Sequence, residues 1–215
     1  MEIFKLILEY IKVLIWPAVV LYCLNLFKDQ IGTFFARVEK ADLPGGISLT
    51  AFQEEIKIGK ELSVEVKEEQ SPKQNKQGFS AIPINEANAR MLNLNLSPSP
   101  SGLELSEYRI LAQQDPNLAL AGIRMEVEIM LKNLAKGFEI PLNGMFSAGI
   151  IVKKLRESGA ITESQMQLIT TVIRLCNSAV HGQKVTLSEA EDILGITEIL
   201  RDDYISWLGW GFPNR

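Results

Sequence analysis

An apolar run at the N-terminus constrains this chain more than any other feature of its sequence. Leu6 to Phe27 covers 22 residues, of which only Glu9, Lys12 and Asn25 are strongly polar. As a helix, such a run would be about 33 Å long, close to the hydrocarbon thickness of a bilayer. We therefore predict a transmembrane helix, and a buried core helix is the alternative.

The residues that flank this run indicate how it is used. No small-residue cleavage site follows it, which disfavours a removable signal peptide. Tyr22 precedes Cys23, where a lipoprotein signal would carry a small residue. Lys28, Arg37 and Lys40 follow the run, and this positive charge predicts a cytoplasmic C-terminal side. We expect a single-pass protein of a cell inner membrane, with the lipid bilayer as one partner and the C-terminal domain in the cytoplasm.

The chain changes character after the anchor and a juxtamembrane helix, which together occupy residues 1–42. Residues 43–70 hold a Pro-Gly break, an alternating stretch at 47–52 typical of a short strand, and a charge-rich helix at 54–69 that is either solvated or self-associating. Residues 71–102 are rich in Ser, Pro, Asn and Gln, which predicts a flexible linker. Its scattered apolar residues could still dock on the domain or on a partner: Ile82, Ile84, Met91, Leu92, Leu94 and Leu96.

Residues 103–215 read as helices with clear start signals. Asp115 suits an N-cap, because Pro116 follows at the first helical position. Thr162 and Gln165 match a capping box, and Thr186 or Ser188 suits the N-cap of the last helix. The expected helices span about Leu105–Gln113, Asp115–Lys136, Met145–Glu157, Thr162–Val180 and Glu189–Trp207.

The predicted fold class is all-α: an N-terminal transmembrane helix, a polar linker and a C-terminal bundle of four to five helices. Trp207, Trp210 and Phe212 end the chain with an aromatic tail, which either packs at the edge of the core or contacts a membrane or partner. The expected core consists of the apolar residues of the predicted helices: Leu120, Ile123, Val127, Leu134, Ile150, Leu155, Ile169, Val172, Ile173, Ile193, Leu194 and Leu200.

Composition excludes several kinds of protein. The net charge of −4 argues against a protein that coats nucleic acid non-specifically, since such binding needs many Lys and Arg on phosphates. The two cysteines, Cys23 and Cys176, form no disulfide framework and have no metal-ligand spacing. His181 is the single histidine, which rules out a multi-histidine metal site. We expect no metal and no cofactor.

Polar residues gather on one side of the helix that begins at Thr162. Arg174 and His181 are seven residues apart, which is close to two turns, and Asn177 and Ser178 lie between them on the same side. A histidine beside a cation can act as a general acid or base, or bind a phosphate. The alternative is an ordinary solvated helix end.

A charged pair is expected on the preceding long helix. Arg124 and Glu128 are four residues apart and share their arc with apolar residues, so we expect them to be desolvated and paired. This pair is either purely structural or reaches the patch around Asn177 and His181 and orients it.

Two strings in these helices resemble a known family. The string from Arg174 to Gly182, RLCNSAVHG, and the earlier string from Leu120 to Glu128, LAGIRMEVE, are similar to the signature of HEPN-like helical domains, as is the order of helices between them. More narrowly, Asn177 to His181 is similar to the Asn-x-Ala-x-His string of an uncharacterised bacterial branch. The resemblance covers about 115–207, under half of the chain.

The resemblance implies a helical bundle that often dimerises. In active members, an Arg and a His with four to six residues between them form a metal-independent ribonuclease site across the dimer, while many other members are not catalytic. Arg174 and His181 have six residues between them, with Asn177 as the intervening polar residue. Relatives commonly carry an Arg directly before this Asn, where the present chain has Cys176, and a neutral thiol cannot bind phosphate as a guanidinium does.

Three functions follow as hypotheses. The first is a membrane-anchored HEPN-like module for partner binding, sensing or oligomerisation, with Arg124, Glu128 and Ser178 as candidate binding residues. The second is a membrane-tethered ribonuclease of a stress or phage-defence system, in which His181 moves a proton at a ribose oxygen and Arg174 holds the scissile phosphate. The third is a purely structural scaffold. The expected partners are a second copy of the chain, RNA or a nucleotide, and a further protein.

Overall fold

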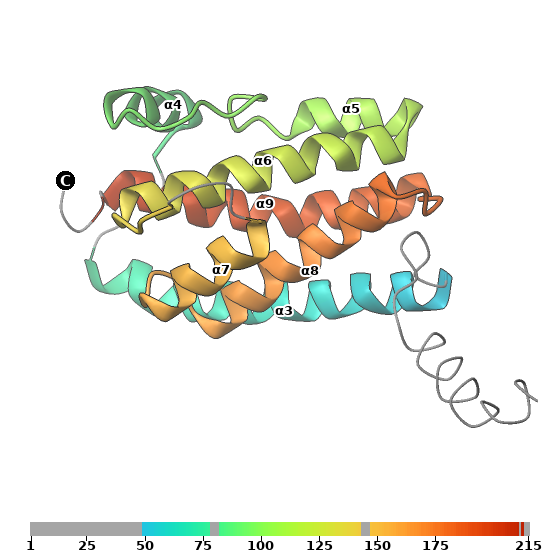
Figure 1. Cartoon of the computed structure of the whole chain (residues 1–215), viewed down its shortest axis with the longest axis horizontal. Helices are drawn as coiled ribbons and strands as arrows, with labels where there is room; N and C mark the ends of the chain where they lie inside the picture. Colours follow the sequence, from blue (N-terminus) through green and yellow to red (C-terminus); the bar gives the residue numbers. More distant parts are fainter. Residues whose placement is uncertain (1–48, 78–81, 143–146, 211, 213–215) are drawn as a thin grey trace, which may run out of the picture. The chain divides into compact units, whose positions relative to one another are not determined.

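Four long helices pack as a closed ring in the computed structural model, which describes residues 49–77, 82–142, 147–210 and 212. The second member packs between the first and the third, and the fourth closes the ring by packing against those same two helices. Figure 1 shows these helices lying roughly along one another. In ring order they are α3 (Leu49–Gln77), α8 (Glu163–Val180), α6 (Pro116–Gly137) and α9 (Leu187–Trp210).

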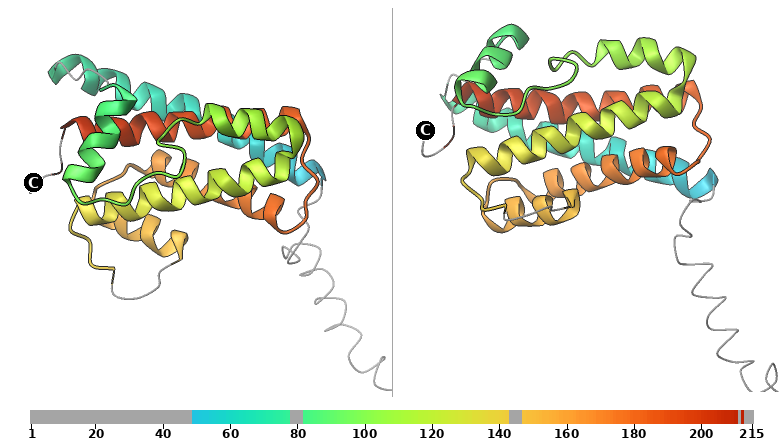
Figure 2. Two further views of the ribbon diagram at one scale, coloured as in Figure 1. Left: turned by 90° about the horizontal axis from the view of Figure 1, so that it is seen from above. Right: turned by 45° about the horizontal axis from the view of Figure 1, so that its top comes forward.

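Three shorter helices cover the ring. α4 (Ile84–Asn93) packs on α9, α5 (Ser106–Gln114) packs on α6 and α9, and α7 (Ala148–Glu157) packs on α6 and α8. Figure 2 shows α5 and α7 on different sides of α6. The described residues contain seven helices and no strand, which confirms the all-α prediction.

The caps read from the sequence define where the helices begin. Asp115 accepts a hydrogen bond from the Leu118 amide at 3.0 Å, which satisfies one of the free N–H groups of α6. Thr162 and Gln165 form the reciprocal capping box at the start of α8. Thr186 exchanges similar bonds with Glu189, so Thr186 rather than Ser188 caps α9.

The expected core is largely confirmed, and only two of the residues expected in it are not fully buried. Ile150 is exposed, because α7 turns Ile151, Val152 and Leu155 toward the bundle instead. Ile173 is only half-buried at the edge of α8. The remaining expected core residues are buried: Leu120, Ile123, Val127, Leu134, Leu155, Ile169, Val172, Ile193, Leu194 and Leu200.

The expected strand at 47–52 is wrong from Leu49 onward, where the chain is already helical. α3 continues through the predicted charged helix at 54–69, and it docks on α8 and α9 of its own chain. A Cβ at Gly59 would lie 3.0 Å from the Ile196 side chain, so the backbone of α3 comes very close to α9 here. The docked face of α3 buries Phe52, Ile56, Ser63 and Val66.

The segment expected to be a flexible linker is ordered wherever it is described. Asn133 of α6 binds the backbone of Ser97 on both sides, accepting from its N–H at 2.9 Å and donating to its carbonyl at 2.8 Å. The buried carboxylate of Glu126 accepts from the Ser99 hydroxyl at 2.6 Å and from the Ser101 amide at 2.7 Å. These bonds hold the Ser-Pro stretch against α6. They offset the conformational entropy that is lost when a segment of this composition becomes ordered.

The domain boundary expected at Leu103 is therefore wrong. The compact unit runs from Gly45 to Arg215 and includes α3 and α4. α4 buries Met91, and the Arg90 guanidinium donates to the carbonyls of Leu208 and Gly209 at the end of α9. A cation at these carbonyls also opposes the negative end of the helix dipole.

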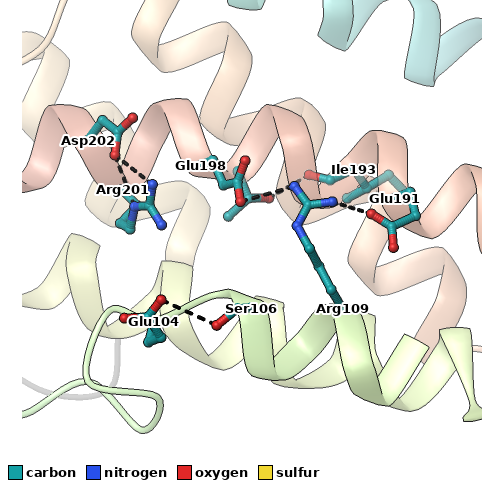
Figure 3. A network of polar contacts seen from close by, with 9 residues as sticks. Glu104, Ser106, Arg109, Glu191, Ile193, Glu198, Arg201 and Asp202 are labelled. Atoms are coloured by element: carbon teal, nitrogen blue, oxygen red, sulfur yellow. Dashed lines mark hydrogen bonds and ion pairs between the residues drawn. The ribbon is translucent and has the colours of Figure 1, made fainter. Parts of the chain in front are cut away.

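α5 is held to α9 by one arginine between two carboxylates (Figure 3). Arg109 forms ion pairs with Glu191 and Glu198, the latter at 3.0 Å. Hydrogen bonding to Glu198 is the main cause that raises the pKa of Arg109 above its ordinary value. The two carboxylates are seven residues apart on α9, so a single guanidinium reaches both from α5.

Trp207 and Phe212 of the aromatic tail pack at the edge of the core, whereas the side chain of Trp210 lies outside the described part of the chain. Phe138 contacts Trp207 edge-to-face at 4.9 Å and Phe212 at 5.6 Å between ring centroids. Phe212 is buried, and a Cβ at Gly137 would lie only 2.2 Å from its ring. A glycine at this position of α6 thus makes room for the ring.

The expected transmembrane helix lies within residues 1–48, outside the residues that the structure describes, and stays a prediction. Among the helices that are described, none combines the length and apolar character that crossing a bilayer requires.

Candidate functional site

The C-terminal half of α8 carries the candidate site, and the helix has the two faces predicted for it. Its inner face buries Val172, Leu175, Cys176 and Ala179. The candidate residues lie on the other side, where two are exposed and two are half-buried: Arg174 and His181, then Asn177 and Ser178. The spacing read from the sequence therefore places all four on the outward side of one helix.

His181 occupies the C-cap of α8, and the local backbone fixes its place. Its amide donates to the Asn177 carbonyl at 2.9 Å, and Gly182 follows with a φ of +102°. Gln183 then donates to the Ser178 carbonyl, which completes a Schellman motif. The His181 side chain is exposed and has no hydrogen bond or ion pair to any described residue. Its imidazole is thus accessible to solvent and to a bound molecule.

Arg174 is exposed but already has an anionic partner. Its guanidinium lies 3.3 Å from the Glu55 carboxylate of α3, with the Arg174 side chain 53% exposed and the Glu55 side chain 13% exposed. Both residues line a depression of about 310 Å³ between α3 and α8. The sequence does not reveal this partner, because Glu55 is one of many acidic residues in its segment and only the docking of α3 selects it.

Ser178 and Asn177 have different surroundings. The Ser178 hydroxyl donates to the Arg174 carbonyl one turn earlier at 3.0 Å, so it is engaged with its own helix. Asn177 is half-buried, and its Oδ1 atom is shielded from solvent without a hydrogen-bond donor among the described residues. A buried acceptor without a donor lowers the stability of the fold, so Asn177 carries the unsatisfied polar group among these four residues.

Arg124 and Glu128 pair on α6 as predicted, at 3.2 Å, although both side chains remain about one-third exposed instead of desolvated. The Arg124 Nε atom is shielded and has no acceptor among the described residues. Burial raises the pKa of the Cys176 thiol to about 12, and the Arg124 charge opposes that rise. Arg124 therefore lies near the buried face of α8 that carries Cys176, and no described hydrogen bond or ion pair joins it to Arg174, Asn177 or His181. The hypothesis that the Arg124–Glu128 pair orients the α8 patch stays a prediction.

Cys176 occupies a position that could not hold an arginine without rearrangement. It is fully buried in the bundle, and its raised pKa keeps it a neutral thiol near pH 7. Packing accounts for a small apolar side chain here, because the residue before Asn177 points into the core.

Asn117 is a positioning residue that the sequence analysis missed. Its Nδ2 atom donates to the carbonyls of Ala179 at 2.8 Å and Gln183 at 2.6 Å, and its Oδ1 accepts from the Val185 amide at 3.3 Å. These contacts hold the backbone on both sides of His181 against the start of α6. An asparagine two residues after a helix cap gives no sequence signal for this role.

The fold and the site together define a helical bundle in which Arg174 and His181 are exposed on one side of α8, seven residues apart. In the described part of the chain, no group of three His, Cys, Asp or Glu residues is placed to hold a metal ion. Comparison with protein families, with curated proteins and with solved structures finds no significant match to this chain.

Proposed function

We propose that this chain is a single-pass inner-membrane protein whose cytoplasmic module resembles HEPN-like domains and serves partner binding, sensing or oligomerisation. The observation that carries the proposal is the mixed surface at the end of the bundle where α6 begins and α8 ends. Asn117 joins the two helices there, and the residues next to the joined positions, Leu118 and Val180, are 54% and 44% exposed. His181 is exposed at the same end.

Such a surface suits recognition better than catalysis alone. Apolar side chains that a monomer leaves in water gain free energy when a partner covers them, at roughly 25 cal/mol per Å². Typical interfaces also have a polar rim. Charged side chains on the same two helices suit this role: the Arg124–Glu128 pair of α6, and Arg174 of α8, which already pairs with Glu55.

Size measurement of the detergent-extracted full chain by light scattering tests this function. We expect a species larger than one chain plus its detergent, and we expect Leu118→Glu to shift it toward the monomer. Leu92→Glu is the matched control, because Leu92 is 66% exposed on α4, which packs on α9 rather than at the joint between α6 and α8. A clean monomer that captures no partner would contradict the proposal.

The membrane part of the proposal needs its own experiment. The 22-residue run from Leu6 to Phe27 supports it. We expect the intact chain in the membrane fraction after cell lysis, released by detergent but not by high salt or alkaline carbonate. Recovery of the intact chain in the soluble fraction would reject the anchor.

A second function is a membrane-tethered, metal-independent ribonuclease, which the exposed imidazole of His181 favours. In this mechanism His181 accepts the proton of a ribose 2′-hydroxyl or donates one to the leaving oxygen, and Arg174 holds the scissile phosphate. The Glu55 partner of Arg174 argues against this function in the isolated chain, because its carboxylate occupies the guanidinium.

RNA cleavage in the presence of EDTA tests this second function. We expect His181→Ala to abolish cleavage and any toxicity on overexpression. Lys184→Ala, which changes an exposed residue three positions later in the same loop, serves as the control. We expect this variant to retain RNA cleavage and toxicity. Unchanged toxicity in His181→Ala would remove His181 from the mechanism.

A further inference from the structure

The ion pair between Glu55 and Arg174 differs from an ordinary surface pair in how its acid is held. Glu55 is 13% exposed, whereas Arg174 is 53% exposed. The residue after Glu55, Ile56, is buried in the bundle, and so is Phe52 three positions before it. The carboxylate therefore cannot move far from Arg174 unless this part of α3 leaves the bundle.

Other contacts fix α3 in register along α8. Glu69 accepts a hydrogen bond from the Thr162 hydroxyl at 2.8 Å, near the other end of the antiparallel pair. Gly59 brings the α3 backbone against the side chains of Thr171 and Ile196. The position of Glu55 opposite Arg174 is thus set by the docking of the whole helix and not by the ion pair itself.

We propose that α3 acts as an autoinhibitory element, in which the docked Glu55 carboxylate competes with a phosphate group for the Arg174 guanidinium. A phosphate that approaches Arg174 meets a fixed negative charge within one ion-pair distance. Phosphate binding at Arg174 and docking of Glu55 therefore weaken each other, so a change that loosens α3 increases the affinity of Arg174 for anions. The inference rests on the proposed ribonuclease function of the same residues, and it describes how α3 would regulate that activity.

The experiment compares Glu55→Gln with Glu54→Gln in the detergent-extracted full chain. Both substitutions remove one negative charge from the same helix, but Glu54 is exposed and its side chain has no ion pair or hydrogen bond to a described residue. The first readout is the rate at which phenylglyoxal modifies Arg174, followed by peptide mass spectrometry. We expect the rate to rise at least threefold in Glu55→Gln and to stay near the wild-type value in Glu54→Gln.

The second readout is the affinity for a fluorescein-labelled single-stranded RNA of twelve nucleotides at low ionic strength. We expect about fivefold tighter binding for Glu55→Gln, and loss of that gain in Glu55→Gln/Arg174→Gln. Glu55→Asp, which keeps the charge on a shorter side chain, controls for packing, and hydrogen exchange along α3 confirms that the helix stays docked.

The outcomes separate the two proposals. Autoinhibition by Glu55 is rejected if phenylglyoxal modifies Arg174 no faster in Glu55→Gln than in Glu54→Gln. It is also rejected if Glu55→Gln/Arg174→Gln keeps the gain in RNA affinity. If Arg174 is modified faster but no variant binds or cleaves RNA, the competition between Glu55 and anions stands and the ribonuclease proposal is rejected.

Discussion

The Glu126 carboxylate accepts a hydrogen bond from the Ser99 hydroxyl at 2.6 Å, and both residues are buried. A carboxylate in the core is stable only when its oxygens are well paired, and here the Ser101 amide and the Tyr108 hydroxyl also donate to it. Burial raises the pKa of Tyr108, and the charge of Glu126 and the hydrogen bond to it raise that pKa further. One side chain of α6 thus organises a segment whose composition is typical of disorder.

We predict that Glu126→Ala lowers the free energy of unfolding by about 3 kcal/mol. The change leaves three donors without their acceptor, and an unsatisfied buried donor costs about 1–3 kcal/mol. Urea unfolding measures the loss, and protease sensitivity within residues 95–103 should rise with it. Glu128→Ala is the control, since its ion pair with Arg124 is about one-third exposed and is worth less than about 1 kcal/mol. Equal losses for the two variants would contradict a special role for Glu126.

Two glycines in helix interiors should respond in opposite ways to alanine. A Cβ at Gly122 would lie 2.2 Å from the Tyr108 ring, so Gly122→Ala forces α5 away from α6 and costs about 1–3 kcal/mol. A Cβ at Gly195 meets no described atom within 4 Å, so Gly195→Ala gains up to about 1 kcal/mol from helix propensity. Thermal unfolding of the two variants side by side measures both changes. A stabilised Gly122→Ala would show that the contact between α5 and α6 is not close.

We predict that Asn117→Ala loosens the turn that carries His181. It removes the side-chain hydrogen bonds to Ala179, Gln183 and Val185, with a loss of about 1–3 kcal/mol. Amide hydrogen exchange in residues 179–185 should accelerate before exchange in the rest of α8. Asn93→Ala, at the exposed end of α4, is expected to leave this exchange unchanged.

The buried thiol of Cys176 predicts a loss of stability at alkaline pH. Burial raises its pKa from an ordinary value near 9.0 to about 12, so between these values the unfolded chain has lost a proton that the folded chain keeps. Fewer protons on the unfolded state mean that stability falls as pH rises, by at most about 1.4 kcal/mol per pH unit, and that this contribution is intact below pH 9. Denaturant titrations from pH 8 to pH 11 should show a shallower decline in Cys176→Ala. Parallel declines in the two proteins would contradict the prediction.

Local signals in the sequence were sufficient for the helices that begin with a cap. Asp115, Thr162 and Thr186 each bond to the first turn of their own helix, so a few neighbouring residues contain all the information required. The exposed side of α8 could be predicted for the same reason, because residues 174–181 are in one continuous helix. The apolar and polar residues there alternate with the period of the helix itself.

Docked segments with small or polar contact residues could not be predicted in this way. The contact face of α3 repeats at Phe52, Ile56, Gly59, Ser63 and Val66, but glycine and serine interrupt its apolar stripe. The Ser-Pro stretch is held by Glu126 and Asn133, whose partners are far away in the sequence. Glu55 was missed as the partner of Arg174 because the selection of one acid among many depends on the packing of α3.

The tight approach of α3 at Gly59 determines how the protein can be dissected. A fragment that starts at Leu103 would leave Ile196 and Thr171 bare, along with the surface that Phe52 and Ile56 cover. Such a fragment would expose core side chains to water and would tend to aggregate, even though it contains every residue of the α8 patch. A soluble piece suitable for crystallisation or NMR should therefore retain α3 from its first turn.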